Sequence, residues 1–263
     1  MAIIQVENLT KKFNGFTAVD DISFSVDEGE IFAFLGPNGA GKSTTIKMLT
    51  TLLQPTSGRL MMDGHDPIKE SHQARRSFGI VFQDQSLDDE LTAWENMEFH
   101  GVLYAVEKIA RRQKIEELLK LVDLWDRRDD LVKKFSGGMK RRLEIARGLL
   151  HKPKILFLDE PTLGLDPQTR NSLWQHVKQL NQQEKVTVFF TTHYMEEAER
   201  MADRIAIIDH GKIIARGTAG ELKTETQTAS LEDAFLSLTG KKIREEAADG
   251  LNHMRMFRNA RQR

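Results

Sequence analysis

A glycine-rich segment at positions 36–44 constrains the fold of this sequence more than any other feature. Its residues are Gly36, Pro37, Asn38, Gly39, Ala40, Gly41, Lys42, Ser43 and Thr44. An apolar run at 31–35 precedes it and a helical pattern follows at 45–49, so we expect a buried strand, a phosphate-binding loop and a helix. Backbone N–H groups and the helix N-terminus then face phosphates, Lys42 reaches the β- and γ-phosphates, and the Ser43 hydroxyl ligates Mg²⁺. The sequence therefore predicts a site for a nucleoside triphosphate.

Composition limits the possible classes. With 263 residues and 40% hydrophobic content, the chain can form one large α/β domain, with or without a substantial insertion. The net charge is −1, from 38 basic and 39 acidic residues, so no overall basic field favours nucleic acid. There is no cysteine, which excludes disulfides and Cys-ligated zinc. The sequence contains neither a secretory signal pattern nor 18 consecutive apolar residues, so we expect no membrane-spanning segment.

Short apolar alternations at 3–9 and 24–26 predict a small β-layer before the nucleotide core. Phe13 lies beside a polar turn between these two segments. Two interpretations of Phe13 are equally open from the residue type: it stacks on an adenine ring, or it caps the edge of the core.

The segment after the first helix leads into a helical region. We expect a helix over 67–76, then a core strand over 78–82 that ends at Gln83. Apolar residues at helical spacing predict an inserted α-helical unit over about 85–151. Near its end, Ser136, Gly137 and Gly138 precede a helix and form either a second phosphate-facing nest or an ordinary helix cap. We interpret Lys140, Arg141 and Arg142 as a solvated helix face rather than a nucleic-acid site.

Two further buried strands end in polar residues. The strand at 155–158 is followed by Asp159 and Glu160, which are costly at that position unless they have a function. In an NTPase the first carboxylate holds Mg²⁺ and the second polarises the attacking water. The strand at 186–192 ends in His193. We therefore expect these strand ends to share one edge of a parallel sheet, where ligands bind in open α/β folds.

The remaining segments complete the expected organisation. Strands at 205–209 and 212–216 and helices at about 218–222 and 230–238 close the folded unit, and a basic polar tail follows over 241–263. We prefer a frayed terminus for the tail over an amphipathic segment on an anionic membrane surface. The expected domain is 1–240, with its core over about 1–84 and 152–220, the insertion over about 85–151 and a C-terminal helix over about 218–240.

Taken together, these motifs resemble the ATP-binding subunit of ABC transporters over residues 3–240. The segment from Phe135 to Met139 is similar to the family signature, although the commonest form has Leu first and Gln last. The resemblance implies a P-loop NTPase, RecA-like core with an N-terminal antiparallel β-layer and an inserted α-helical subdomain. It also implies five roles for residues of this chain: adenine stacking by Phe13, a lid position linking Mg²⁺ and water to the membrane partner at Gln83, a catalytic base at Glu160, a γ-phosphate contact by His193, and a crossing of the dimer interface by Asp166.

The resemblance further implies partners and a cellular location. Two copies close head to tail around two ATP molecules, with Ser136, Gly137 and Gly138 of one copy facing the ATP of the other. The pattern is similar to the drug and antibiotic-resistance branch of exporters, whose ATPases work at the cytoplasmic face of the membrane with a separate ABC-2-type permease. An ATPase that acts on ribosomes or DNA is the alternative hypothesis.

Four apolar residues of the insertion line either a groove for the permease or the insertion's own core: Leu87, Leu91, Trp94 and Phe99.

Overall fold

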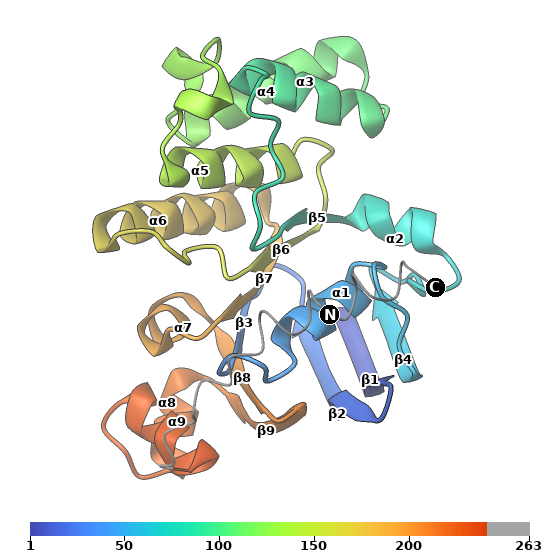
Figure 1. Ribbon diagram of the computed structural model, residues 1–263, viewed down its shortest axis with the longest axis vertical. Helices are drawn as coiled ribbons and strands as arrows, with labels where there is room; N and C mark the ends of the chain where they lie inside the picture. Colours follow the sequence, from blue (N-terminus) through green and yellow to red (C-terminus); the bar gives the residue numbers. More distant parts are fainter. Residues whose placement is uncertain (241–263) are drawn as a thin grey trace, which may run out of the picture.

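The computed structural model describes residues 1–240, which form two β-sheets flanked by helices (Figure 1). The larger sheet has six strands in the order β5-β6-β7-β3-β8-β9, and the smaller has three in the order β2-β1-β4. The basic tail expected over 241–263 lies outside the described residues, so both hypotheses about it stay predictions. Within 1–240, every helix is too short or too polar to cross a membrane.

The larger sheet is parallel apart from one edge strand. Its members are β3 (Ile31–Leu35), β5 (Phe78–Val81), β6 (Ile155–Asp159), β7 (Thr187–Thr192), β8 (Arg204–Asp209) and β9 (Lys212–Gly217). Strand β9 pairs antiparallel with β8. Every residue of β3, β6 and β7 is buried, as expected for parallel strands covered on both faces. The carboxyl ends of β3, β5, β6 and β7 therefore meet at one sheet edge, as predicted.

The smaller sheet is the predicted antiparallel β-layer, but its strands are longer than expected. They are β1 (Ala2–Phe13), β2 (Phe16–Asp27) and β4 (Ser57–Met62). Register shifts between β1 and β2 interrupt the apolar alternation, which hid much of both strands from the sequence pattern. The Phe24 ring lies 5.7 Å from Phe32 and 6.0 Å from Phe189, so an aromatic cluster joins this layer to the larger sheet.

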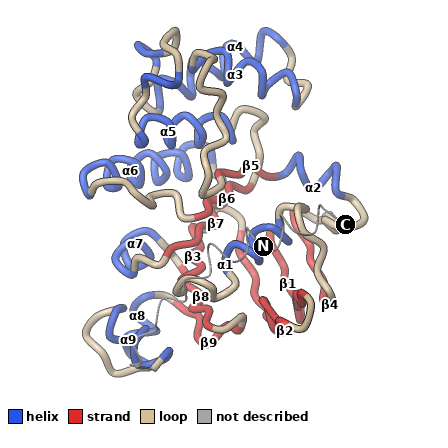
Figure 2. The backbone as a smooth tube through the Cα atoms, viewed as in Figure 1, coloured by secondary structure: helices blue, strands red, loops and turns tan. Residues whose placement is uncertain are grey.

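Helices α5 (Gly137–Gly148) and α6 (Pro167–Glu184) lie against the larger sheet on the side away from the smaller sheet (Figure 2). Helices α3 (Ala93–Leu103) and α4 (Lys108–Leu121), which also lie between β5 and β6 in the sequence, pack on α5. The shorter helices are α2 (Ser71–Ser77), α7 (Met195–Met201), α8 (Ala219–Glu225) and α9 (Leu231–Thr239). The prediction that a helix starts at Pro67 was wrong, because the Asp66 carboxylate accepts from the N–H groups of Ile68 and Lys69 and holds a turn there.

Two partly buried histidines lie where α3 meets the chain after α5. The Tyr104 ring stacks on His151 with centroids 3.9 Å apart, and His100 lies 4.8 Å from Tyr104. Nε2 of His151 lies 3.0 Å from the Phe78 carbonyl oxygen, whereas Nε2 of His100 and Nδ1 of His151 have no hydrogen-bond partner among residues 1–240. Burial lowers the pKa of His100 to about 3 and that of His151 to about 4. Both imidazoles are therefore neutral at physiological pH.

Acid is expected to destabilise this fold through the two imidazoles. Because their folded-state pKa values are depressed, the unfolded chain binds protons that the folded chain excludes. The free energy of unfolding should fall as the pH drops below about 6.5, by at most about 1.4 kcal/mol per pH unit for each imidazole. A His100→Phe variant keeps an aromatic ring beside Tyr104 but cannot titrate. Urea unfolding at about pH 7.5 and about pH 5 should show a smaller loss for this variant than for the wild type. Equal losses in the two proteins would contradict this account.

Candidate functional site

The glycine-rich loop follows β3 and leads directly into helix α1 (Lys42–Leu49). Two of its glycines are required by neighbouring backbone. A Cβ atom on Gly36 would lie 2.4 Å from the carbonyl oxygen of Ile208, and one on Gly41 would lie 2.6 Å from that of Ala18. Gly41 also has a φ of 107°, in the left-handed region that favours glycine. Strands β8 and β2 thus press against the loop and fix its shape.

The Lys42 side chain folds back into its own loop and is only 5% exposed. Its ammonium donates to the carbonyl oxygens of Gly36 at 2.7 Å and Pro37 at 3.1 Å. It also forms an ion pair with Glu160, whose Oε1 lies 3.0 Å away. Since these acceptors already surround the ammonium, a phosphate that binds Lys42 must replace some of them.

Asp159 ends β6 and is almost fully buried. Its Oδ1 accepts from the Thr191 hydroxyl at 2.6 Å and from the Ser43 hydroxyl at 3.2 Å. Of the three residues expected to hold Mg²⁺, which are Ser43, Gln83 and Asp159, Ser43 and Asp159 are therefore in direct contact. A hydroxyl beside a carboxylate is a set of hard oxygen donors, which suits that cation.

Glu160 adopts a backbone conformation that is uncommon for a residue with a side chain. Its φ is 47°, and its N–H lies 3.0 Å from the Thr191 hydroxyl and 3.2 Å from the Thr191 carbonyl oxygen. Its Oε2 lies 3.1 Å from Nδ1 of His193. One carboxylate thus bridges Lys42 and His193, and the strained backbone is held by contacts to the neighbouring strand.

Sequence reasoning missed Glu197, which binds the loop after β6 and the end of β7. Glu197 lies in α7 and is buried. Its Oε1 accepts from the Thr162 hydroxyl at 2.6 Å and its Oε2 from the Thr192 hydroxyl at 3.1 Å. An acidic residue in the first turn of a helix is commonly a solvent-exposed dipole contact, so the sequence carried no signal of this burial.

Gln83 and Phe13 are more exposed than the residues above. Gln83 follows the end of β5, at the same sheet edge as the glycine-rich loop. Phe13 ends β1, is 41% exposed, and has the Lys11 ammonium 4.9 Å from its ring centre. Because the ring is half open to solvent rather than packed in the core, its exposure favours a stacking role over a capping role.

The second predicted nest lies elsewhere in the same chain. Ser136 caps α5 by accepting from the N–H of Met139 at 3.3 Å, and Asp166 caps α6 by accepting from the N–H of Thr169 at 3.0 Å. Hydrogen bonds from Thr169 hold the pKa of Asp166 below its usual value. A Cβ on Gly138 would lie 2.3 Å from the Thr169 side chain, so these two loops are neighbours. Figure 1 shows α5 and α1 in different parts of the molecule.

The expected solvated face at Lys140, Arg141 and Arg142 was a wrong prediction. Arg141 is 6% exposed and pairs with buried Glu144 at 2.9 Å. The Arg142 guanidinium donates to the Val122 carbonyl oxygen at 2.7 Å, and Lys140 pairs with Asp89 at 2.7 Å. These cations turn toward neighbouring segments instead of water, because the insertion supplies carbonyl and carboxylate acceptors on that side of α5.

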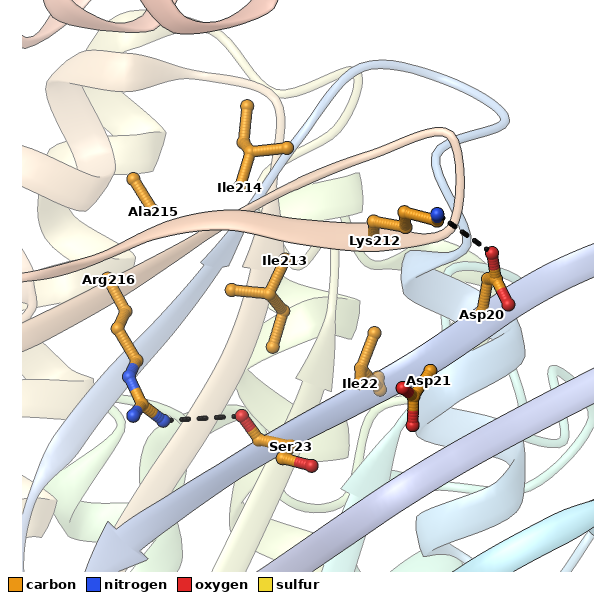
Figure 3. Close-up of a pocket in the computed structure, with 9 residues that line it drawn as sticks. All are labelled: Asp20, Asp21, Ile22, Ser23, Lys212, Ile213, Ile214, Ala215 and Arg216. Atoms are coloured by element: carbon orange, nitrogen blue, oxygen red, sulfur yellow. Dashed lines mark hydrogen bonds and ion pairs between the residues drawn. The ribbon is translucent and has the colours of Figure 1, made fainter.

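A groove of about 450 Å³ lies at the seam between the two sheets, away from the sheet edge described above. Figure 3 shows that residues of β2 and β9 line it. Lys212 pairs with Asp20 at 3.2 Å, and Arg216 donates to the Ser23 carbonyl oxygen at 3.3 Å across the groove. None of the predicted site residues lines this groove.

Comparison with known proteins agrees with the geometry. A family model described as ABC transporter matches residues 19–163. A daunorubicin/doxorubicin resistance ATP-binding protein of Streptomyces peucetius is 47% identical over 84% of this chain and 67% of its own length. A linearmycin resistance ATP-binding protein of Bacillus subtilis is 44% identical over 92% of this chain and 76% of its own.

Two solved structures share the fold. An ATP-binding subunit of an ABC transporter superposes with a TM-score of 0.81 at 30% identity, covering 90% of this chain and all of that one. A dimeric ATP-binding cassette in a post-hydrolysis state, bound to ADP and phosphate, has a TM-score of 0.73 at 29% identity and covers 82% of this chain and 98% of that one. These likenesses confirm the predicted α/β P-loop fold.

Proposed function

This chain belongs to the ABC transporter family, and we propose that it is the ATP-hydrolysing subunit of an exporter that drives a separate membrane permease. The observation that carries the proposal is the buried Glu160 carboxylate, which bridges Lys42 and His193 at the end of the parallel sheet. The relatives named for resistance to antibiotics support export of a drug or another amphipathic compound. They favour this function over the alternative of an ATPase acting on ribosomes or nucleic acid.

In the proposed mechanism the chain's own charges exchange partners when ATP binds. Backbone N–H groups of the 36–44 loop and the start of α1 hold the phosphates, and Lys42 leaves Glu160 for the β- and γ-phosphates. The Glu160 carboxylate then accepts a proton from the attacking water as general base. Nδ1 of His193 stays beside Glu160, and its other ring nitrogen, Nε2, donates to the γ-phosphate. Phe13 stacks on the adenine ring.

Mg²⁺ fits the donor set on this chain. Ser43, Asp159 and Gln83 would hold it, Asp159 through water. When bound, the ion neutralises charge that develops on the phosphates. The Thr191 hydroxyl, which donates to Asp159 at 2.6 Å, keeps that carboxylate in place for this task.

A second copy of the chain is proposed to complete each ATP site. Ser136 and Gly137 are exposed at the start of α5 and Gly138 is buried behind them, and Figure 1 shows α5 apart from α1, the helix that follows the 36–44 loop. Helix N-termini with exposed backbone N–H groups attract phosphate, so we propose that this nest closes on the γ-phosphate held by the partner copy. Asp166, beside the nest, would then lie in the interface. The dimeric relative with ADP and phosphate supports this arrangement.

The permease is proposed to be of the ABC-2 type and to bind an apolar stripe on α3, which places the chain at the cytoplasmic face of the membrane. Leu87 and Trp94 pack partly buried against the core, which favours the core hypothesis for those two residues. By contrast, Phe99, Val102 and Leu103 are 62%, 54% and 66% exposed. Their spacing places them on one face of the helix. An exposed apolar face of this kind suits a cytoplasmic helix of the partner.

A Glu160→Gln variant tests the catalytic proposal. The amide cannot accept the proton of water, so kcat for ATP should fall by about a hundredfold or more. ATP binding should persist with an equal or lower Kd, because the variant removes the ion pair that competes with phosphate for Lys42. Steady-state hydrolysis and fluorescence titration with a labelled ATP analogue measure the two effects. Near-normal turnover would show that the base is another residue.

Cysteine cross-linking tests the docking stripe. The chain has no native cysteine, so Phe99→Cys and Leu103→Cys each introduce a unique thiol. Co-expressed with the permease, both should form adducts with its cytoplasmic segments. Leu236→Cys, an exposed position on α9, is the matched control and should form none. Equal labelling of the control, or no adduct from either stripe position, would refute this surface.

A further inference from the structure

Side chains of helix α5 hold the loop that carries Gln83, which follows strand β5. This loop, residues 82–89, joins β5 to the segment that leads into α3. Four side chains of α5 contact it: Lys140, Arg141, Glu144 and Arg147. Helix α5 is also the helix whose start presents the nest at Ser136. One rigid element therefore connects the two.

Arg141 fixes the backbone at Gln83 itself. Its guanidinium donates from Nη1 to the Phe82 carbonyl oxygen at 2.5 Å and from Nη2 to the Gln83 carbonyl oxygen at 2.9 Å. Nη1 also donates to Glu144 at 2.9 Å. The planar fork of arginine spans two successive carbonyl groups, which a lysine ammonium cannot do with the same geometry. The position of the Gln83 main chain thus depends on Arg141.

Glu144 fixes the same loop three residues further on. It is 1% exposed, and its Oε1 accepts from the N–H of Ser86 at 2.7 Å and from the Ser86 hydroxyl at 3.0 Å. Arg147 donates to the Ser86 carbonyl oxygen at 2.8 Å. A buried ion pair of this kind contributes little net stability compared with apolar residues of the same size. The desolvation cost of burying this ion pair is consistent with a role in positioning the 82–89 loop.

We propose that Arg141 and Glu144 are positioning residues that make Gln83 move together with the nest at Ser136. The inference rests on the proposed function, in which that nest binds the γ-phosphate of a second copy. Ser136 and Arg141 lie about 7.5 Å apart along one helix, so a shift of α5 toward the partner's nucleotide carries the 82–89 loop with it. Closure of the dimer would thereby place the Gln83 amide at its own Mg²⁺ and attacking water.

The test uses the full-length chain and removes both members of the Arg141–Glu144 ion pair together. The double variant Arg141→Met/Glu144→Met keeps the volume of the core and should fold, because neither Arg141 nor Glu144 is left buried without the other. Arg142→Met is the matched control: it removes a cation from the same helix, one that contacts Val122 and not the loop. Thermal unfolding confirms that each variant is folded. If the double variant is unstable, Arg141→Lys keeps the charge beside Glu144 and loses only the fork.

The decisive measurement is a double-mutant cycle with Gln83→Ala. The paired variant should lower kcat for ATP by about tenfold or more, with KM for ATP changed less than about twofold, because only the Gln83 side of the site is displaced. It should also raise the Mg²⁺ concentration needed for half-maximal activity. In the Gln83→Ala background the same substitutions should add no further loss, since the residue they act through is already gone.

Two results would separate the possible failures. If Gln83→Ala retains wild-type kcat, the role proposed for Gln83 is wrong, and with it the premise of this inference. If Gln83→Ala lowers kcat, and the paired substitutions lower kcat by the same factor in the Gln83→Ala background as in the wild type, the inference is overturned. It is also overturned if Arg142→Met lowers kcat as much as the paired variant does. In either case Arg141 and Glu144 act on stability alone.

Discussion

The ion pair between Lys42 and Glu160 is the interaction on which the site depends. Both groups are nearly buried, and a buried charge is tolerated only with a partner and hydrogen bonds. Lys42 satisfies Glu160 and two loop carbonyls, and His193 takes the second carboxylate oxygen. One network of polar contacts, made by Lys42, Glu160 and His193, therefore holds together the glycine-rich loop, the end of β6 and the end of β7.

This network of polar contacts explains how ATP binding can change the contacts of Lys42 and Glu160. In the proposed mechanism, a triphosphate offers Lys42 a stronger partner and leaves Glu160 free to accept a proton. Glu160 is kept close by a left-handed backbone that Thr191 anchors through two contacts, and Glu197 ties together the segments on either side. The residues that do not move preserve the geometry while Lys42 changes partners. In this proposal, the binding energy of ATP acts on the carboxylate that we assign as the catalytic base.

The sequence predicted much of this site because its signals are local. A glycine-rich loop between strand and helix, and acidic residues directly after a buried strand, are patterns within a few positions of each other. The parallel sheet followed from the same buried runs. What escaped prediction depends on contacts between distant segments: Arg141 binds a loop 58 residues away, and Glu197 binds Thr162. Nothing in the local pattern distinguishes such buried charges from solvated ones. The β1 and β2 ends were missed because bulges break the alternation that marks a strand.

We propose above all that this chain holds half of each ATP site. Loops 36–44 and 136–138 lie in different parts of one copy (Figure 1), and a nucleotide between two copies would be contacted by both. The most direct measurement is static light scattering of Glu160→Gln at micromolar protein, with and without ATP and Mg²⁺. We predict the mass of one chain without nucleotide and of two chains with it, and a reversal when Ser136→Arg is added to block the nest. A strict monomer under both conditions would contradict the claim.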